Sequence, residues 1–427
     1  MTDHNMRILW TSNIVLPAVA PDLGLPQSPF GGWLTLMTGQ LARHGGFDIG
    51  IAMRAPVPEL RRIDKDGISY FAVPQNRRDK FDVTQAACDT VLRDFAPDIL
   101  HVEGAEMRHA RRFLSTWDGP RLLSMQGVLH GYAAYETGRL PIMRMLNPLR
   151  PRDALAALAL LANRQLRFMP RLAHEREAMG LATHVMGRTL WDRAQAEALA
   201  PAAQYYHCPR ILRDIFYDMD RNRAETEPHS IFIGNGASPR KGAHVVLEAM
   251  TLLKRDFPNI RLYIAGDDPE HRPITSIKRH VGYPSYLRRQ ITRLGLETNV
   301  TFTGVLPEAD MAARMARSHV FVMASIIENS PNTLGEAMML GVPVVSAYTG
   351  GAPSMAADER EALFYRPDDP AMLAHQIRRV FNDPATAETR AQAARARALD
   401  THDPAQNLGA LVAAYGDIMQ GGTPADG

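Results

Sequence analysis

The chain has 427 residues, of which 45% are hydrophobic and 22% are charged, an ordinary balance for a globular protein. This length exceeds one ordinary hydrophobic core and predicts two domains of roughly 200 residues each. The formal net charge of +2 argues against the strongly basic class of nucleic-acid-binding proteins. The two cysteines, Cys88 and Cys208, form neither a zinc motif nor a disulfide framework and favour a reduced, cytoplasmic setting.

The apolar stretches of the chain are short. The start MTDHNMR leads into a short apolar run and then a polar loop, which does not fit a signal peptide. The longest strongly apolar run, residues 154–162, has about half the length that spans a bilayer. We therefore expect a protein that does not cross a membrane.

The first half of the chain alternates between β-rich apolar runs and helical patterns. This alternation predicts a parallel, doubly wound sheet. Strands are expected at residues 7–12, 48–53, 69–73, 99–103 and 121–125, and a helix at about 83–95.

A loop rich in proline and glycine follows the first strand and ends in the sequence FGGW, residues 30–33. Apolar residues at helical spacing continue from it over 34–41. The pair Gly31 and Gly32 allows the backbone to approach a phosphate or sugar closely. Taken alone the pair is weak evidence, because glycines that only permit a turn are commoner.

In the second half, a strand at 230–234 runs into a glycine-rich turn and then a helix with one apolar face. The turn contains Asn235, Gly236, Arg240 and Lys241. Backbone amides and a guanidinium in such a turn suit a diphosphate, although the spacing is wrong for a P-loop. In isolation, Arg240 and Lys241 would be interpreted as solvated surface cations.

The remaining elements of the second half follow the same alternation. Further strands are expected at 260–265 and 300–303, closed by loops at 266–268 and 304–306, with helices at 372–381 and 408–418. The polar stretch 218–228 predicts the domain linker.

The stretch from His319 to Pro353 predicts one strand–helix–strand unit. Its strands are expected at 320–324 and 342–346. Between them a helix is expected to begin at Pro331 with Ser330 as its cap and to stop at Gly341, because a hydroxyl caps free N–H groups and proline suits the first helical position.

Two glutamates in this unit point to ligand binding. Glu328 lies where the first strand ends, the edge at which open α/β sheets bind ligands. Glu336 lies within an apolar helix, where an unpaired buried charge is costly and a ligand hydroxyl pair would satisfy it. The helix start between them suits a phosphate. The alternative is that Glu336 is a surface residue on an amphipathic helix.

The run ENSPNTLGEAMMLGVPVVSAYTGG resembles the donor-binding signature of the retaining glycosyltransferases of family four. That resemblance implies the GT-B fold, an α/β architecture of two Rossmann-like, doubly wound parallel-sheet domains that face a central cleft. It implies that Glu336 holds the ribose of a nucleotide-sugar, that Glu328 contacts the transferred sugar, and that Lys241 and Arg240 contact the leaving group. The implied donor-binding positions are Gly31, Gly32, Asn235, Gly236, Asn329, Ser330, Pro331, Asn332, Thr333, Leu334 and Glu336.

The resemblance also implies the domain bounds. An acceptor-binding domain is expected at 1–217, with a C-terminal helix at 402–420 crossing back onto it. The linker at 218–228 leads to a donor-binding domain at 229–401, and a tail at 421–427 is expected to be disordered.

Polar residues follow the last two strands of the first domain: His101, Glu103, Gln126 and His130. In the family a histidine usually stands near the reacting sugar at the position of Gln126. Gln126 can still hydrogen-bond a sugar hydroxyl, and His130 is the other candidate for that role. His101 is better explained as a satisfied residue at a strand end.

Residues 138–176 mix arginines with leucine, methionine and alanine and have a helical pattern at about 153–168. Such a surface could contact an anionic membrane or a lipid-linked acceptor, with the protein peripheral at the inner face of the membrane. A helix packed on its own domain with solvated arginines is the favoured interpretation.

We expect no metal and no cofactor. Two acidic pairs, Asp64/Asp66 and Asp218/Asp220, have the D-x-D spacing that holds a metal in other glycosyltransferases, but about one or two such matches arise by chance. Cations and helix dipoles would stabilise the departing diphosphate instead. A UDP-sugar is favoured over a GDP-sugar as donor, with a hydroxyl of a glycan, lipid-linked or small molecule as acceptor.

The implied reaction is sugar transfer with retained configuration, by front-face attack in which the leaving phosphate helps to take the acceptor proton. Glu328 would orient the sugar, and polysaccharide or glycoconjugate biosynthesis is the expected setting. The alternatives are a nucleotide-sugar epimerase of GT-B fold and a non-catalytic nucleotide-sugar-binding subunit. A Rossmann dehydrogenase is disfavoured because no G-x-G-x-x-G follows the first strand.

Overall fold

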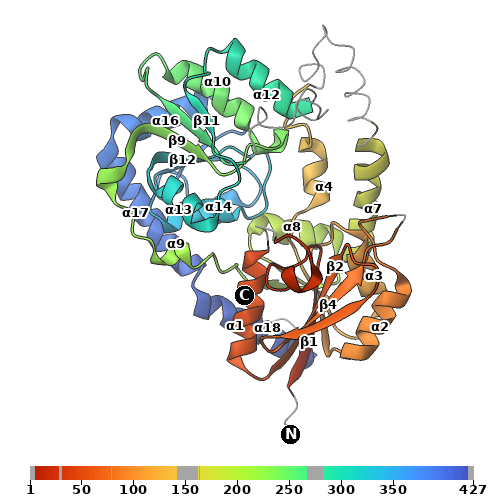
Figure 1. Ribbon diagram of the computed structural model, residues 1–427. Helices are drawn as coiled ribbons and strands as arrows, with labels where there is room; N and C mark the ends of the chain where they lie inside the picture. Colours follow the sequence, from red (N-terminus) through yellow and green to blue (C-terminus); the bar gives the residue numbers. More distant parts are fainter. Residues whose placement is uncertain are drawn as a thin grey trace. The chain divides into compact units, whose positions relative to one another are not determined.

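The computed structural model describes residues 5–27, 31–77, 79–141, 162, 164–266 and 282–421. The chain forms two compact units (Figure 1), each built around one sheet. Unit 1 contains residues 1–130, 168–213 and 402–427, and unit 2 contains residues 131–167 and 214–401. The described residues of segment 131–167 therefore group with unit 2, whereas the sequence placed this segment in the first domain. The expected domain bounds stay predictions.

Unit 1 is organised around an eight-stranded sheet with the order β3-β4-β2-β1-β5-β6-β7-β8. All neighbours are parallel except the edge hairpin β3–β4. The strands are β1 (Met6–Ser12), β2 (Phe47–Ala55), β3 (Arg61–Lys65), β4 (Ile68–Pro74), β5 (Ile99–Glu103), β6 (Arg121–Ser124), β7 (His184–Gly187) and β8 (Gln204–His207).

Helices cover both faces of this sheet, as its fully buried central strand β5 requires. One face packs on a core to which α2, α3, α7 and α8 contribute. The opposite face carries α1 and the C-terminal helix α18, which contact each other. The helices of unit 1 are α1 (Gly32–His44), α2 (Gln85–Phe95), α3 (Arg108–Thr116), α7 (Met169–Leu181), α8 (Leu190–Leu199) and α18 (Pro404–Met419); the short helix α4 (Leu129–Tyr132) spans the boundary.

The last helix is fixed to unit 1 by a buried hydrogen bond. Tyr415 of α18 lies 2.6 Å from Nδ1 of His101, whose Nε2 lies 2.6 Å from Ser124 Oγ. His101 is fully buried, and burial lowers its pKa to about 3. The interpretation of His101 as a satisfied strand residue is confirmed, since both ring nitrogens have partners.

Unit 2 is organised around a six-stranded parallel sheet with the order β11-β10-β9-β12-β13-β14. Its strands are β9 (Glu227–Ile233), β10 (Arg261–Ile264), β11 (Val300–Phe302), β12 (Ser318–Met323), β13 (Val344–Ala347) and β14 (Leu363–Tyr365). Its helices are α9 (Ile215–Asp218), α10 (Ala243–Leu253), α12 (Gly282–Arg293), α13 (Glu308–Ala316), α14 (Asn332–Met339), α15 (Ala352–Met355), α16 (Pro370–Asn382) and α17 (Pro384–Thr401).

The strands expected from the apolar runs are present within one to three residues at each end, and the prediction of two doubly wound sheets is confirmed. Four strands were not expected: β3, β7, β8 and β14. Three of them have only three or four residues, and β3 has only one apolar residue. Such short or polar strands depend on their neighbours in the sheet for stability.

No helix within the described ranges is long and apolar enough to cross a membrane. Most of the basic, apolar helix expected at 153–168 lies outside the described residues, as does nearly all of the tail at 421–427. Residues 267–268 of the expected loop after β10 also lie outside them. The peripheral membrane contact stays a prediction.

Candidate functional site

The candidate site in unit 2 lies at the carboxyl edge of its sheet, where β12 gives way to α14. The helix begins at Asn332, one residue later than expected, and Pro331 is its N-cap with an extended ψ of 111°. Ser330 does not cap the helix, because its hydroxyl lies 3.9 Å from the sulfur of Met355. The stop at Gly341 is confirmed by its positive φ of 66°, a conformation that glycine adopts at little cost.

The start of α14 offers backbone donors. The carbonyl of Pro331 accepts hydrogen bonds from the N–H groups of Leu334 and Gly335, at 2.9 and 3.5 Å. The earlier amides, those of Asn332 and Thr333, belong to the first turn, which has no acceptor within the helix. These two N–H groups and the positive end of the helix dipole therefore suit an anion.

Glu328 follows β12 and is paired with a cation. Its Oε1 accepts a short hydrogen bond from Lys241 Nζ and another, at 3.0 Å, from the Ser325 hydroxyl. Its main-chain carbonyl is held by the N–H of Gly351 at 3.1 Å. Two donors therefore hold the carboxylate and a third holds the main chain of the same residue, and the side chain is mostly buried.

The loop that carries Lys241 is pressed against the end of β12. The N–H of Ile326 donates to the carbonyl of Arg240 at 2.7 Å. Gly242 has a φ of 71°, and a Cβ placed on it would lie 1.8 Å from the carbonyl oxygen of Ala324. Only glycine fits this approach, which is what brings Lys241 to Glu328. The Arg240 guanidinium lies 5.1 Å from the ring centre of Tyr132.

Glu336 lies in the second turn of α14 and is 3% exposed. The alternative that it is a surface residue on an amphipathic helix is therefore wrong. Helix α14 packs against α13 and α17 and contacts β12 and β13. A carboxylate in such surroundings is retained only with polar partners, which leaves its predicted role with a ribose open.

A cavity in unit 2 brings several predicted residues together. Asn235, Lys241, Glu328, Pro331 and Thr333 line it. The remaining lining comes from the carboxyl ends of β9 and β12 and from Ser325. Gly236, Arg240, Asn329, Ser330, Asn332, Leu334 and Glu336 are outside the lining.

In unit 1, Gln126 and His130 occupy different surroundings. Gln126 Nε2 donates to Glu103 at 3.0 Å. His130 Nδ1 lies 2.6 Å from Oε2 of Glu175, and Arg176 Nη2 lies 3.4 Å from Nε2 of the same ring. Because an acid accepts on one side and a guanidinium donates on the other, the neutral tautomer with a proton on Nδ1 fits both contacts.

Gly31 and Gly32 begin α1. Gly31 is the N-cap with a φ of 93°, and a Cβ there would lie 2.7 Å from Cδ1 of Ile14. The apolar residues predicted on one face of this helix are buried in unit 1. Gly31 thus serves the turn and close packing, and the predicted contact of Gly31 and Gly32 with a donor stays a prediction.

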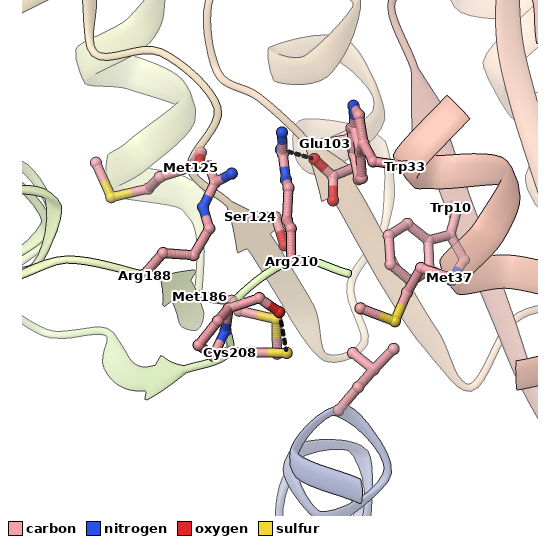
Figure 2. Close-up of a pocket in the computed structure, with 12 residues that line it drawn as sticks. Trp10, Trp33, Met37, Glu103, Ser124, Met125, Met186, Arg188, Cys208 and Arg210 are labelled. Atoms are coloured by element: carbon pink, nitrogen blue, oxygen red, sulfur yellow. Dashed lines mark hydrogen bonds and ion pairs between the residues drawn. The ribbon is translucent and has the colours of Figure 1, made fainter. Parts of the chain in front are cut away.

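A second cavity, at the carboxyl edge of the unit 1 sheet, contains residues that the sequence did not single out (Figure 2). Its polar lining includes Arg188, Arg210, Glu103 and Ser124, and its apolar lining includes Trp33. Of these, the sequence marked only Glu103, as a polar residue at a strand end. Nothing in the local pattern singled out Arg188 or Arg210, because their neighbours in the cavity come from distant segments.

Within the described ranges, no group of three or more histidine, cysteine or acidic residues could hold a metal ion. The first D-x-D pair lies on the edge hairpin β3–β4, where Asp64 bonds Ser69 and Arg62. The second begins at the last residue of α9. The independence from metal stays a prediction.

Solved structures resemble this chain over nearly its whole length in fold, and D-inositol 3-phosphate glycosyltransferase 1 from Catenulispora acidiphila is 24% identical in sequence over 88% of this chain and 88% of its own length. Residues 216–397 match the model of the family described as glycosyl transferases group 1. Glycogen synthase from Mycobacterium tuberculosis is 27% identical over 181 residues, which are 42% of this chain and 41% of the relative. The chain thus spans about two-fifths of the length of that curated relative.

Two solved structures share the fold. Sucrose-phosphate synthase from Thermosynechococcus elongatus superposes with a TM-score of 0.72 at 17% identity and covers 98% of this chain and 100% of its own. The Anabaena protein Alr3699/HepE, solved in complex with UDP-glucose, has a TM-score of 0.64 at 16% identity and covers 97% of this chain and 100% of its own.

Proposed function

The chain is a GT-B protein whose residues 216–397 belong to the group 1 glycosyltransferases, and on this premise we propose that it transfers a sugar from a nucleotide-diphosphate sugar to an acceptor hydroxyl. The observation that carries the proposal is the contact between Lys241 and Glu328 beside the start of α14. It places a cation, an acid and free helix amides at the ligand-binding edge of a parallel sheet.

The diphosphate is the part of the donor that this edge suits best. Lys241 lines the cavity, and its charge would stabilise the phosphate oxygens as the sugar leaves. Arg240, next to it in the loop, is the second cation. The amides of Asn332 and Thr333 would add hydrogen bonds to the same oxygens.

Donor binding would change the pairing of Lys241. In the structure the Lys241 ammonium forms an ion pair with Glu328. A bound diphosphate competes for the same ammonium and releases the carboxylate, which can then accept hydrogen bonds from the sugar hydroxyls. The ion pair therefore keeps both side chains in place until the donor arrives.

The stereochemistry and the donor are part of the proposal. We assign retention of configuration with front-face attack, in which the leaving phosphate takes the acceptor proton and Glu328 orients the sugar. Glu336 would hold the ribose. A UDP-sugar is the preferred donor, which the UDP-glucose complex of the HepE structure supports. No metal or cofactor is needed in this scheme, because cations and amides offset the charge of the diphosphate.

The first experiment identifies the donor. Purified full-length protein is heated with UDP, GDP, ADP or dTDP and with their sugar conjugates, because a ligand that binds only the native state raises the melting temperature. The selected donor is then incubated with a panel of hydroxyl acceptors, and the anomeric configuration of the product is read by NMR. Addition of EDTA tests the metal-free scheme.

Variants of the ion pair test the site. Lys241→Ala should weaken nucleotide binding at least about tenfold, since a charge-assisted contact is lost. The matched control is Lys254→Ala, whose ammonium donates to the carbonyl of Gly295 in an exposed contact of the same unit, and it should leave binding unchanged.

Three results would overturn the proposal. Unchanged donor turnover in both Glu328→Gln and Glu336→Ala would remove the site assignment. Conversion of the donor sugar without an acceptor would identify an epimerase. Tight nucleotide binding without turnover on every acceptor would identify a binding subunit.

A further inference from the structure

The cavity of unit 1 is assembled from segments far apart in the chain. Its wall takes residues from β1, α1 and α18, from the carboxyl ends of β5, β6 and β7, and from the segment that follows β8. Its lining residues are Trp10, Trp33, Met37, Glu103, Ser124, Met125, Met186, Arg188, Cys208, Pro209, Arg210 and Leu411. It therefore lies at the edge where a parallel sheet binds its ligands.

Two guanidinium groups share this wall with a single carboxylate. Figure 2 shows Arg188 and Arg210 extending side by side. Arg210 Nη2 lies 3.5 Å from Glu103 Oε2. Arg188 donates to the main-chain carbonyl of Met125, and among the described residues no ion pair joins it to a carboxylate. The lining therefore carries more positive than negative charge.

The other acids nearby are already engaged. Asp192 accepts hydrogen bonds from the N–H groups of Arg188 and Thr189 and from the Tyr205 hydroxyl. Glu106 accepts from the N–H of Gly127 at 2.5 Å. Neither Asp192 nor Glu106 lines the cavity, so neither offsets its excess of cations at the wall.

The position and the charged neighbours of the Arg210 guanidinium favour the binding of an anion. This guanidinium lies 3.5 Å from the ring centre of Trp33, which fixes its plane. Burial, and after it the neighbouring Arg188 charge, lower the pKa of Arg210 to about 9, while the Glu103 charge opposes the shift. A bound anion would relieve the repulsion between the two guanidinium groups, and two planar forks match the oxygens of a phosphate or carboxylate.

Most of the remaining wall is apolar. Trp10, Met37, Met186 and Leu411 provide it together with the indole of Trp33. Such a wall packs against the carbon skeleton of a small molecule and excludes water from the ion pairs. The cavity therefore suits a small organic anion rather than a neutral sugar or a long apolar chain.

We propose that this cavity binds the anionic group, a phosphate or a carboxylate, of a small hydroxylated acceptor, with Arg188 and Arg210 as its ligands. The identification of this ligand as the acceptor rests on the proposed function. The binding of an oxyanion at the two arginines stands on the contacts within unit 1 alone.

The test is calorimetric titration of the full-length protein, without donor, against inorganic phosphate, glucose 6-phosphate, glucuronate and glucose. We expect the charged sugars to bind and glucose to bind at least about tenfold more weakly, because one charge-assisted pair contributes on that order. Tighter binding of glucose 6-phosphate identifies a sugar phosphate, and tighter binding of glucuronate identifies a sugar acid. Equal affinity for glucose, or no binding of any anion, overturns the proposal.

Variants locate the binding. Arg188→Gln should weaken the binding of the charged sugars at least about tenfold. Arg188→Lys should retain part of the affinity because it keeps the charge. Arg188 is chosen first because Arg210→Gln would leave the buried Glu103 carboxylate without its cation. The matched control is Arg193→Gln, an exposed arginine that pairs with Glu197 on α8, and it should bind as the native protein does. Unchanged binding in Arg188→Gln overturns the site.

A second readout separates this inference from the proposed function. Lys241→Ala should lose nucleotide affinity and keep anion affinity, whereas Arg188→Gln should do the reverse. In a transfer assay, Arg188→Gln should raise the KM for the charged acceptor more than it lowers kcat. An anion that binds through Arg188 but is not glycosylated overturns the acceptor role, and failure of every nucleotide to bind overturns the proposed function.

Discussion

The cavities of the two units use their cations in opposite ways. In unit 2 the cation that lines the cavity, Lys241, is paired with Glu328, so that each charge has a partner in the chain. In unit 1 two arginines line the cavity with one acid, and Arg188 is bonded to a neutral carbonyl.

This difference indicates two ways of preparing a site for an anion. A paired cation must release its acid before it binds the anion, which costs affinity but frees an acid to contact the ligand. An unpaired cation binds the anion directly, and the cost is repulsion in the empty site. The first arrangement suits a site where chemistry follows binding, and the second suits a site that only holds a group.

The largest effect on stability is expected at Gly242, whose close approach to Ala324 brings Lys241 to Glu328. Gly242→Ala places a Cβ against the Ala324 carbonyl at a positive φ, so we expect a loss of about 3–5 kcal/mol in the free energy of unfolding. Gly295→Ala is the matched control, because Gly295 has a φ of 62° and nothing within 4 Å of an added Cβ. It should cost about 1 kcal/mol. Urea denaturation followed by circular dichroism measures both, and equal losses would contradict the role of the close approach.

The next effect tests the pairing itself. Glu328→Gln should lower donor turnover by about 100-fold, because a group that contacts the reacting sugar is changed. The same change should strengthen UDP binding a few-fold, since Lys241 no longer has a competing acid. Steady-state kinetics and UDP titration measure the two quantities.

The opposite signs of these two results distinguish a specific effect from general damage. Glu359→Gln is the control, because Glu359 forms an exposed ion pair with Arg379 in the same unit. It should change neither quantity. Weaker UDP binding in Glu328→Gln would contradict the competition between acid and diphosphate.

A smaller effect on stability is expected at the hydrogen bond between Tyr415 of α18 and His101 in unit 1. Tyr415→Phe removes the hydroxyl that bonds His101 and leaves one buried ring nitrogen without its partner. The loss should be about 1–3 kcal/mol in the free energy of unfolding. Tyr348→Phe changes an exposed tyrosine and should have no measurable effect. Equal stability of the two variants would show that the C-terminal helix is not fixed through Tyr415.

The smallest effect concerns Glu106, an acid whose charge acts on Arg210 of the unit 1 cavity. Burial raises the pKa of Glu106 from its ordinary value of 4.5 to about 7. Its contribution to stability is therefore fully present below pH 4.5 and is lost as the pH rises through 7, because the unfolded chain releases this proton first.

Glu106→Gln cannot ionise and should remove that part of the pH dependence. Relative to the native chain, the variant should gain about 1–3 kcal/mol between pH 4.5 and pH 8. Glu177→Gln, a change of an exposed acid on α7, should follow the native pH profile. Urea denaturation at several pH values measures the difference, and parallel profiles for Glu106→Gln and the native chain would contradict the raised pKa.

Much of unit 2 could be predicted because its signals are local. Residues 318–347 form one strand, helix and strand in which hydrophobic period, proline and glycine all agree, so local patterns suffice to place the acids at 328 and 336. Lys241 joined them only through the resemblance to a family. Its contact with Glu328 depends on the fit of Gly242 against β12, which no local pattern reveals.

The sequence by itself predicted the two doubly wound sheets, the elements around Glu328 and Glu336, and the resemblance of the second half to a glycosyltransferase family. Tertiary structure alone decided the burial of Glu336, the pairing of Lys241 and the cavity of Arg188 and Arg210. The physical reason is the distance along the chain over which the interactions act. Strands and helices arise from periodicity over a few residues, whereas this cavity needs residues as distant as Trp10 and Leu411 to meet at one sheet edge.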